Sequence, residues 1–161
     1  MDKRMEILNL IEKNSHLSAA EIAAMTDMSE EAVRAEIRTM EQEKVICGYH
    51  TIINWDKVDE ELVTALIELK VTPQSGDGYR ELARRICDYS QVESIYLMSG
   101  VYDFMVTVKG QTLREISMFV NEKLASIPEV QSTSTHFTLV KYKDHGTNLL
   151  TSKKDERMVM F

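Results

Sequence analysis

The chain has 161 residues, of which 43% are hydrophobic and 28% charged, and its formal net charge is −7 at pH 7. This composition is typical of a soluble globular protein and excludes a disordered chain, while the length suits one ordinary domain or two small ones. The negative charge excludes general attraction to DNA or anionic lipid, so a nucleic-acid function would need local basic patches.

The cysteines and the N-terminus bear on metal binding and location. Cys47 and Cys87 stand forty residues apart, without a Cys-x-x-Cys pair or a Cys/His cluster, so a zinc site has little support. Residues 1–13 are charged throughout, and no apolar run approaches the roughly 18 residues that span a membrane. We therefore expect a cytoplasmic protein with no cofactor, no metal and no membrane partner.

The N-terminal third predicts three short helices. Residues 3–14 carry an apolar stripe at helical spacing. Ser18 and Glu21 have the spacing of a capping box, which opens a second helix. Ser29 can cap a third helix. The apolar positions at helical spacing are Ile7, Leu8, Ile11, Ile22, Ala23, Met25, Val33, Ile37 and Met40.

A small β element is expected after the third helix. Residues 45–54 favour one or two short β segments with a bend at Gly48. With the three helices, this predicts a winged helix-turn-helix domain over residues 1–54. Residues 55–61 are polar and acidic, and we interpret them as a linker.

The chain beyond residue 62 alternates strand and helix patterns. A Pro/Gly/Ser-rich loop at 73–78 precedes a helix, and Thr112 with Glu115 predicts a capping box for a second helix. Strands are expected at 62–72, 92–99, 104–109 and 130–143. This order is the split βαβ, or ferredoxin-like βαββαβ, arrangement, so the whole chain is predicted to be α+β.

One face of the predicted sheet is too apolar to meet water. The helices would cover the first face, and the second would show Leu66, Tyr96, Met98, Met105 and Phe137. Such a patch usually indicates a partner surface, and a homodimer packed sheet to sheet is the simplest solution. Residues 144–161 have no clear period and are interpreted as a C-terminal tail.

These features together resemble the Lrp/AsnC, or feast/famine, family of bacterial and archaeal regulators. The resemblance covers residues 3–143, and residues 17–54 and the sequence SGVYD at 99–103 carry it. It implies a C-terminal RAM (AsnC-type) domain that binds an amino acid or a related small effector. It also implies homodimers that can assemble further into octamers.

The third helix is acidic, yet its outward face is mixed. On a helical wheel its five glutamates divide between two flanks and one outward position, and the outward face carries donors and small residues. A groove-reading helix needs such groups, and a helix N-terminus can hold a phosphate. The predicted contacts to double-stranded DNA are Ser29, Glu31, Arg34, Ala35, Arg38, Thr39 and Gln42. The alternative is a solvated, salt-bridged face, with Glu30 and Arg34 four residues apart.

The resemblance places the effector near the hairpin between the second and third strands. By residue match the contacts are Ser99, Gly100, Tyr102 and Asp103, joined by Thr133, Ser134 and Thr135 from a neighbouring subunit. Backbone N–H groups near a glycine can hold a carboxylate, and an aspartate can pair with an α-ammonium group. Alternatively, a simple turn explains the glycine, aspartate and tyrosine without any ligand.

No catalytic motif stands out. The four histidines, His16, His50, His136 and His145, lie in different predicted elements without metal-ligand spacing. Sirohaem decarboxylases resemble the same two-domain plan, but they hold a polycarboxylate with clustered basic and histidine residues, and these strands offer few. A sensor or assembly protein that does not bind DNA is the other alternative. The sequence therefore favours a DNA-binding regulator over an enzyme.

Overall fold

The computed structural model describes residues 2–58, 62–72 and 76–150. The chain divides into two compact units, Met1–Ile52 and Ile53–Phe161, which we call the N-terminal and C-terminal units. The division falls two residues before the linker expected from the sequence. Among the described residues, no helix is long and apolar enough to cross a bilayer.

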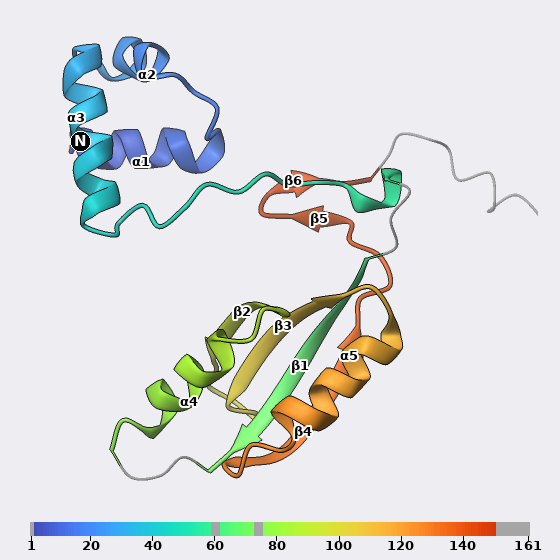
Figure 1. The fold of residues 1–161 in the computed structure, drawn as a ribbon. Coiled ribbons are helices and arrows are strands. Elements are labelled where there is room, and N and C mark those ends of the chain that lie inside the picture. The colour runs from blue at the N-terminus through green and yellow to red at the C-terminus, as the bar shows by residue number, and fades with distance from the viewer. Residues whose placement is uncertain (1, 59–61, 73–75, 151–161) are drawn as a thin grey trace, which may run out of the picture. The chain divides into compact units, whose positions relative to one another are not determined.

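Three helices form the N-terminal unit: α1 (Lys3–Lys13), α2 (Ala19–Thr26) and α3 (Glu30–Gln42) (Figure 1). Both hydrogen bonds of the predicted capping box between Ser18 and Glu21 are present, and the Ser29 hydroxyl accepts from the Ala32 N–H at 3.2 Å. These caps satisfy backbone groups that a helix start leaves unpaired. The three helices enclose a core that contains Ile7, Ile22, Ala23, Val33 and Met40.

The expected β element after α3 is not formed, so this prediction was wrong. Residues 45–54 contain no strand, and Ile52 and Ile53 are exposed. A strand needs a partner for its backbone hydrogen bonds, and the described part of the N-terminal unit contains no second strand. A short 3₁₀ helix, Trp55–Lys57, follows where a plain linker was expected.

The C-terminal unit has the predicted βαββαβ order. Its elements are β1 (Val63–Val71), α4 (Gly78–Cys87), β2 (Val92–Leu97), β3 (Phe104–Gly110), α5 (Leu113–Phe119) with a π-helical turn (Val120–Leu124), and β4 (Val130–Phe137). The strands form one antiparallel sheet in the order β2-β3-β1-β4, and both helices lie on the same face of it (Figure 1). This is the ferredoxin-like fold.

Alternation along β1 and β3 separates a core face from an open face. Ala65, Ile67 and Leu69 of β1 are fully buried under the helices, whereas Leu66 between them is 39% exposed. Tyr96 and Met105 pair on the open face, as predicted. Polar groups share that face, and they include Glu68, Lys70, Ser134 and His136.

The last predicted strand differs from the structure in extent and in the placement of one side chain. Strand β4 ends at Phe137 and not at residue 143. Phe137 pairs with Ala65 and packs on the core, so its expected position on the open face was wrong. The mostly polar residues of β4 gave no hydrophobic period from which to set the register.

Part of the predicted tail is ordered structure. Strands β5 (Lys143–Asp144) and β6 (Thr147–Asn148) form a hairpin. Its two turn residues, His145 and Gly146, have φ of 41° and 81°, as two-residue hairpin turns require. Residues 151–161 of that tail lie outside the described residues.

Candidate functional sites

The outward face of α3 is accessible within its unit. All seven residues predicted to contact DNA are exposed. Val33 and Met40, by contrast, are fully buried against the other two helices. The helical wheel therefore predicted correctly which face of this helix is buried and which is exposed.

The two arginines of this face differ in their partners. Arg34 donates to Glu30 on the same helix, with Nε–Oε1 at 2.9 Å and Nη2–Oε1 at 2.5 Å, while 56% of its side chain remains exposed. Arg38 has neither a hydrogen bond nor an ion pair to any side chain in the part of the chain that the structure describes. An exposed ion pair of this kind is worth little, so Arg34 can exchange Glu30 for a phosphate.

The flanking carboxylates of α3 are occupied by partners in their own unit. Arg4 of α1 pairs with Glu36 at 3.4 Å and hydrogen-bonds to Glu43, and this bond raises the pKa of Arg4. The Tyr49 hydroxyl donates to Glu41 at 2.9 Å, and burial together with that carboxylate raises the pKa of Tyr49. Each of these carboxylates thus has a partner within the unit, and the outward face keeps its donors.

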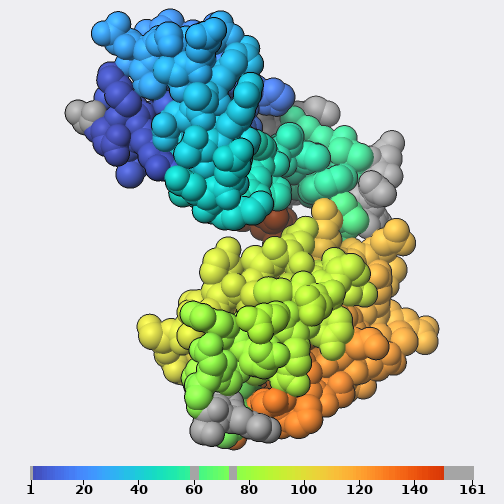
Figure 2. Space-filling model, turned by 60° about the vertical axis from the view of Figure 1, so that its left-hand side comes forward, coloured from blue at the N-terminus to red at the C-terminus, as the bar shows by residue number. Residues whose placement is uncertain are grey.

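The connection between β2 and β3, residues 98–103, contains the predicted effector residues of the hairpin at 99–103. It projects from the surface of the C-terminal unit, where it is yellow in Figure 2. Ser99 and Gly100 are exposed, and Tyr102 is half-buried. A Cβ added to Gly100 would meet nothing within 4 Å. The tip is therefore open to a ligand or to a neighbouring subunit.

Asp103 anchors this hairpin to the sheet. Its carboxylate accepts from the Val71 N–H at 2.8 Å and pairs with Lys70 at 3.2 Å, and its own N–H donates to the Leu69 carbonyl at 2.9 Å. The Val71 bond, with the charge of Lys70, lowers the pKa of Asp103. Neither sequence interpretation described this bond, because it joins residues 32 positions apart.

We expect Asp103→Ala to destabilise the protein by about 1–3 kcal/mol at pH 7, because the Val71 N–H loses its partner. Since folding lowers the pKa of this carboxyl, its contribution is complete above the unfolded pKa of about 3.9 and is lost as pH falls through the folded value. Urea unfolding at several pH values measures the difference in the free energy of unfolding between the wild type and Asp103→Ala. This difference should shrink in acid. Asp56→Ala, an exposed control, should leave stability unchanged; an equal loss from both substitutions would contradict the anchoring role.

The three hydroxyl residues predicted on β4 do not share one face. Thr133 and Thr135 pair with Leu69 and Ile67 on the core face and are partly buried. Ser134 lies on the open face, where its hydroxyl is 3.2 Å from His136 Nε2. One ligand cannot reach all three from one side, because neighbouring residues of a strand point in opposite directions.

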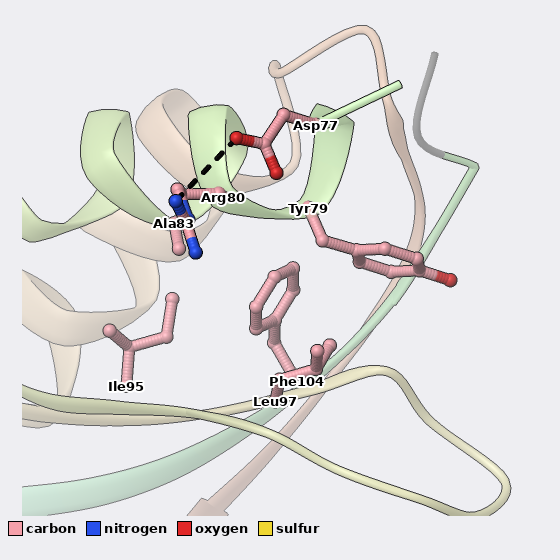
Figure 3. Close-up of a pocket in the computed structure, with 7 residues that line it drawn as sticks. All are labelled: Asp77, Tyr79, Arg80, Ala83, Ile95, Leu97 and Phe104. Carbon is pink, nitrogen blue, oxygen red and sulfur yellow. Dashed lines mark ion pairs between the residues drawn. The ribbon is translucent and has the colours of Figure 1, made fainter. Parts of the chain in front are cut away.

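A shallow pocket of about 290 Å³ lies beside the hairpin, between α4 and strands β2 and β3. Figure 3 shows Ile95 and Phe104 pointing toward α4, with Asp77 and Arg80 at the start of the helix. These two charges form an ion pair of 3.8 Å and are largely exposed. The other lining residues are Tyr79, Ala83 and Leu97. The sequence does not reveal this pocket, because an apolar helix stripe indicates core packing equally well.

Both parts of the chain match known protein families. The family model of the Lrp/AsnC ligand-binding domain matches residues 64–148, and a winged helix-turn-helix DNA-binding model matches residues 2–46. YugG, an HTH-type transcriptional regulator of Bacillus subtilis, is 43% identical over 160 residues, covering 99% of this chain and 96% of that protein. The chain belongs to the Lrp/AsnC family.

Solved structures show the same fold as this Lrp/AsnC protein. The leucine response regulatory protein LrpA of Mycobacterium tuberculosis has a TM-score of 0.74 at 19% identity, covering 93% of this chain and 99% of that one. A transcriptional regulator of Neisseria meningitidis, solved in complex with L-Met, has a TM-score of 0.69 at 19% identity, covering 89% and 92%. This Lrp/AsnC protein is thus a DNA-binding transcriptional regulator with a ligand-binding domain.

The four histidines of this Lrp/AsnC protein lie in different segments of the structure. Within residues 2–58, 62–72 and 76–150, no three His, Cys, Asp or Glu side chains gather as metal ligands would. His136 lies 3.5 Å from Glu68 on the open sheet face, while His145 occupies the β5–β6 turn.

Proposed function

We propose that the protein is a sequence-specific DNA-binding regulator that reads duplex DNA with the outward face of α3. The observation that carries this proposal is the charge arrangement of that helix. Arg34 and Arg38 are exposed, and the glutamates on the flanks have partners within the unit. Guanidinium groups can pair with guanine edges or phosphates, and Ala35 and Thr39 permit close approach.

The proposal includes a homodimer, because one short helix reads too few bases to be selective. Two reading helices related by a twofold axis address two half-sites, separated by one helical turn or a multiple of it. The open sheet face supports self-association through its apolar residues, of which Leu66, Tyr96 and Met98 are exposed and Met105 is partly buried. Further assembly of these dimers into octamers belongs to the same proposal.

Selection from sheared genomic DNA tests specific reading. The protein is mixed with the fragments in about 150 mM salt, where nonspecific binding to a chain of this charge should be weak. Sequencing of the retained fragments should reveal a shared, two-part motif with twofold symmetry. Retention without any common motif would leave only nonspecific binding and would contradict the proposal.

The C-terminal unit is proposed to sense an amino acid or a similar small metabolite at the hairpin and the pocket beside it. A volume of about 290 Å³ lies at the small end for ligand sites, which suits a molecule the size of an amino acid. The Arg80 and Asp77 charges match an α-carboxylate and an α-ammonium, and Phe104 with Ile95 offers apolar contact. Ligand binding near a subunit contact would shift assembly or the relative orientation of the reading helices, which is a linkage effect.

A thermal-shift screen across the amino acids checks this sensing role. A ligand present at a hundred times its dissociation constant should raise the melting temperature by roughly 5–10 °C, because it binds only the folded state. Arg80→Ala should reduce the shift if the pocket holds the carboxylate, with Arg84→Ala on the same helix as the control. No shift with any amino acid would contradict an amino-acid effector.

Since the proposed regulator acts on chromosomal DNA, we place the protein in the cytoplasm.

A further inference from the structure

One cation in the N-terminal unit contacts two carboxylates, one in α3 and one on the residue that caps its C-terminus. The Arg4 guanidinium of α1 lies 3.4 Å from Glu36 through Nε, and its Nη2 hydrogen-bonds to Glu43. About a third of the side chains of Arg4 and Glu36 is exposed, and about half of that of Glu43. Arginine suits this position, because its fork of five donors can hold two carboxylates at once.

The two glutamates lie on the flank of α3 beside the proposed reading face. They are seven residues apart, which is two helical turns, so they point to the same side. Glu36 is two residues from both Arg34 and Arg38, so it projects from the opposite flank of the helix to these arginines. Residues 30–44 contain five glutamates and three basic residues, a net charge of −2, and Arg4 brings the local sum to −1.

A carboxylate left unpaired here would oppose DNA binding, because it would stand at the edge of the reading face and repel the phosphates of the duplex. Arg4 limits this repulsion by directing Glu36 and Glu43 toward α1. The pairing also fixes α3 against α1, which orients the helix that is presented to a groove.

We propose that Arg4 is a positioning residue for DNA recognition, which acts by withdrawing Glu36 and Glu43 from the reading face of α3. It does so without contacting DNA itself. The inference rests on the proposed function of α3 and adds a residue from a different helix to it.

The test measures the affinity of the full-length protein for a fluorescent 30-base-pair duplex of random sequence and for the duplex selected from genomic DNA. Arg4→Gln should weaken binding to both about tenfold at 50 mM salt, and the loss should shrink as salt screens the exposed carboxylates. Arg4→Lys keeps the charge and should retain most of the affinity. Lys13→Gln, which removes a charge from the last turn of α1, is the matched control and should have little effect.

Recovery of DNA affinity in a further variant distinguishes the proposed effect of Arg4 on the two carboxylates from a general loss of structure. The triple variant Arg4→Gln, Glu36→Gln, Glu43→Gln should bind at least as well as the wild type, because no carboxylate remains to be withdrawn. If Arg4→Gln fails to fold, the double variant Glu36→Gln, Glu43→Gln with Arg4 intact decides instead, and it should bind DNA no more weakly than the wild type. Circular dichroism checks that each variant is folded.

Failure of this inference and failure of the proposed function give different results. If the wild type binds neither duplex, the proposed DNA reading by α3 fails. If the wild type binds and Arg4→Gln binds equally well, only the role of Arg4 is overturned. A folded Arg4→Gln variant whose loss is the same at every salt concentration and is not rescued by the triple variant would also overturn it.

Discussion

Replacing Arg34 and Arg38 together by alanine is expected to lower the affinity for the selected duplex at least about 30-fold, since each base or phosphate contact contributes roughly 1–3 kcal/mol. Arg38 should account for more of the loss, because Arg34 must first leave its ion pair with Glu30. Fluorescence anisotropy of each single variant and of the double variant measures both effects. The salt dependence of binding should weaken by about one unit of slope per phosphate contact removed.

The matched control is Arg80→Ala with Arg84→Ala on α4. It removes the same charge from exposed, acid-paired arginines outside the N-terminal unit. Its effect on DNA affinity should be small. Equal losses from the two double variants would mean that net charge, and not the face of α3, governs binding.

The second prediction with a large expected effect concerns the stability of the sheet in the C-terminal unit. Ile67→Ala is expected to destabilise this unit by about 2–5 kcal/mol, because it leaves a cavity in a close-packed core. Ile67 is fully buried at the centre of β1, where Val106 and Thr135 are its cross-strand partners. The single tryptophan, Trp55, belongs to the same unit and contacts Lys109, so its fluorescence can follow urea unfolding.

Leu66→Ala, one residue earlier, is the natural comparison. Its side chain is 39% exposed on the open face, so the same loss of volume should cost a protomer less than about 1 kcal/mol. At low protein concentration the free energies of unfolding of the two variants should differ clearly. The stability of Leu66→Ala should depend on protein concentration where a dimer forms through the open face. Similar losses at every concentration would contradict the assignment of the two faces.

How far the sequence predicts this molecule depends on the range of the interaction concerned. The helices and caps are local, so the spacing of Val33 and Met40 and the box of Ser18 with Glu21 were enough to place them. The order of elements in the C-terminal unit followed from strand alternation and helical spacing in the same way.

The features that the sequence could not predict depend on contacts between distant residues. The contacts of Arg4 with Glu36 and Glu43 depend on how α1 packs on α3, and the Asp103 bond to Val71 depends on how β3 pairs with β1. The core position of Phe137 depends on the register of a polar strand. The local pattern of residues 45–54 predicted strands that are not formed. Their composition is strand-like, but the described part of the N-terminal unit contains no partner strand for them.

The most direct test of DNA reading by α3 compares two duplexes of equal length and base composition. One carries the motif recovered from genomic DNA, the other a scrambled version, and both are titrated with full-length protein at 150 mM salt. We expect the motif to bind at least about 1,000-fold more tightly, as specific recognition requires, and Arg38→Ala to reduce that ratio. Equal affinity for the two duplexes, or a ratio unchanged by Arg38→Ala, would contradict sequence reading by this helix.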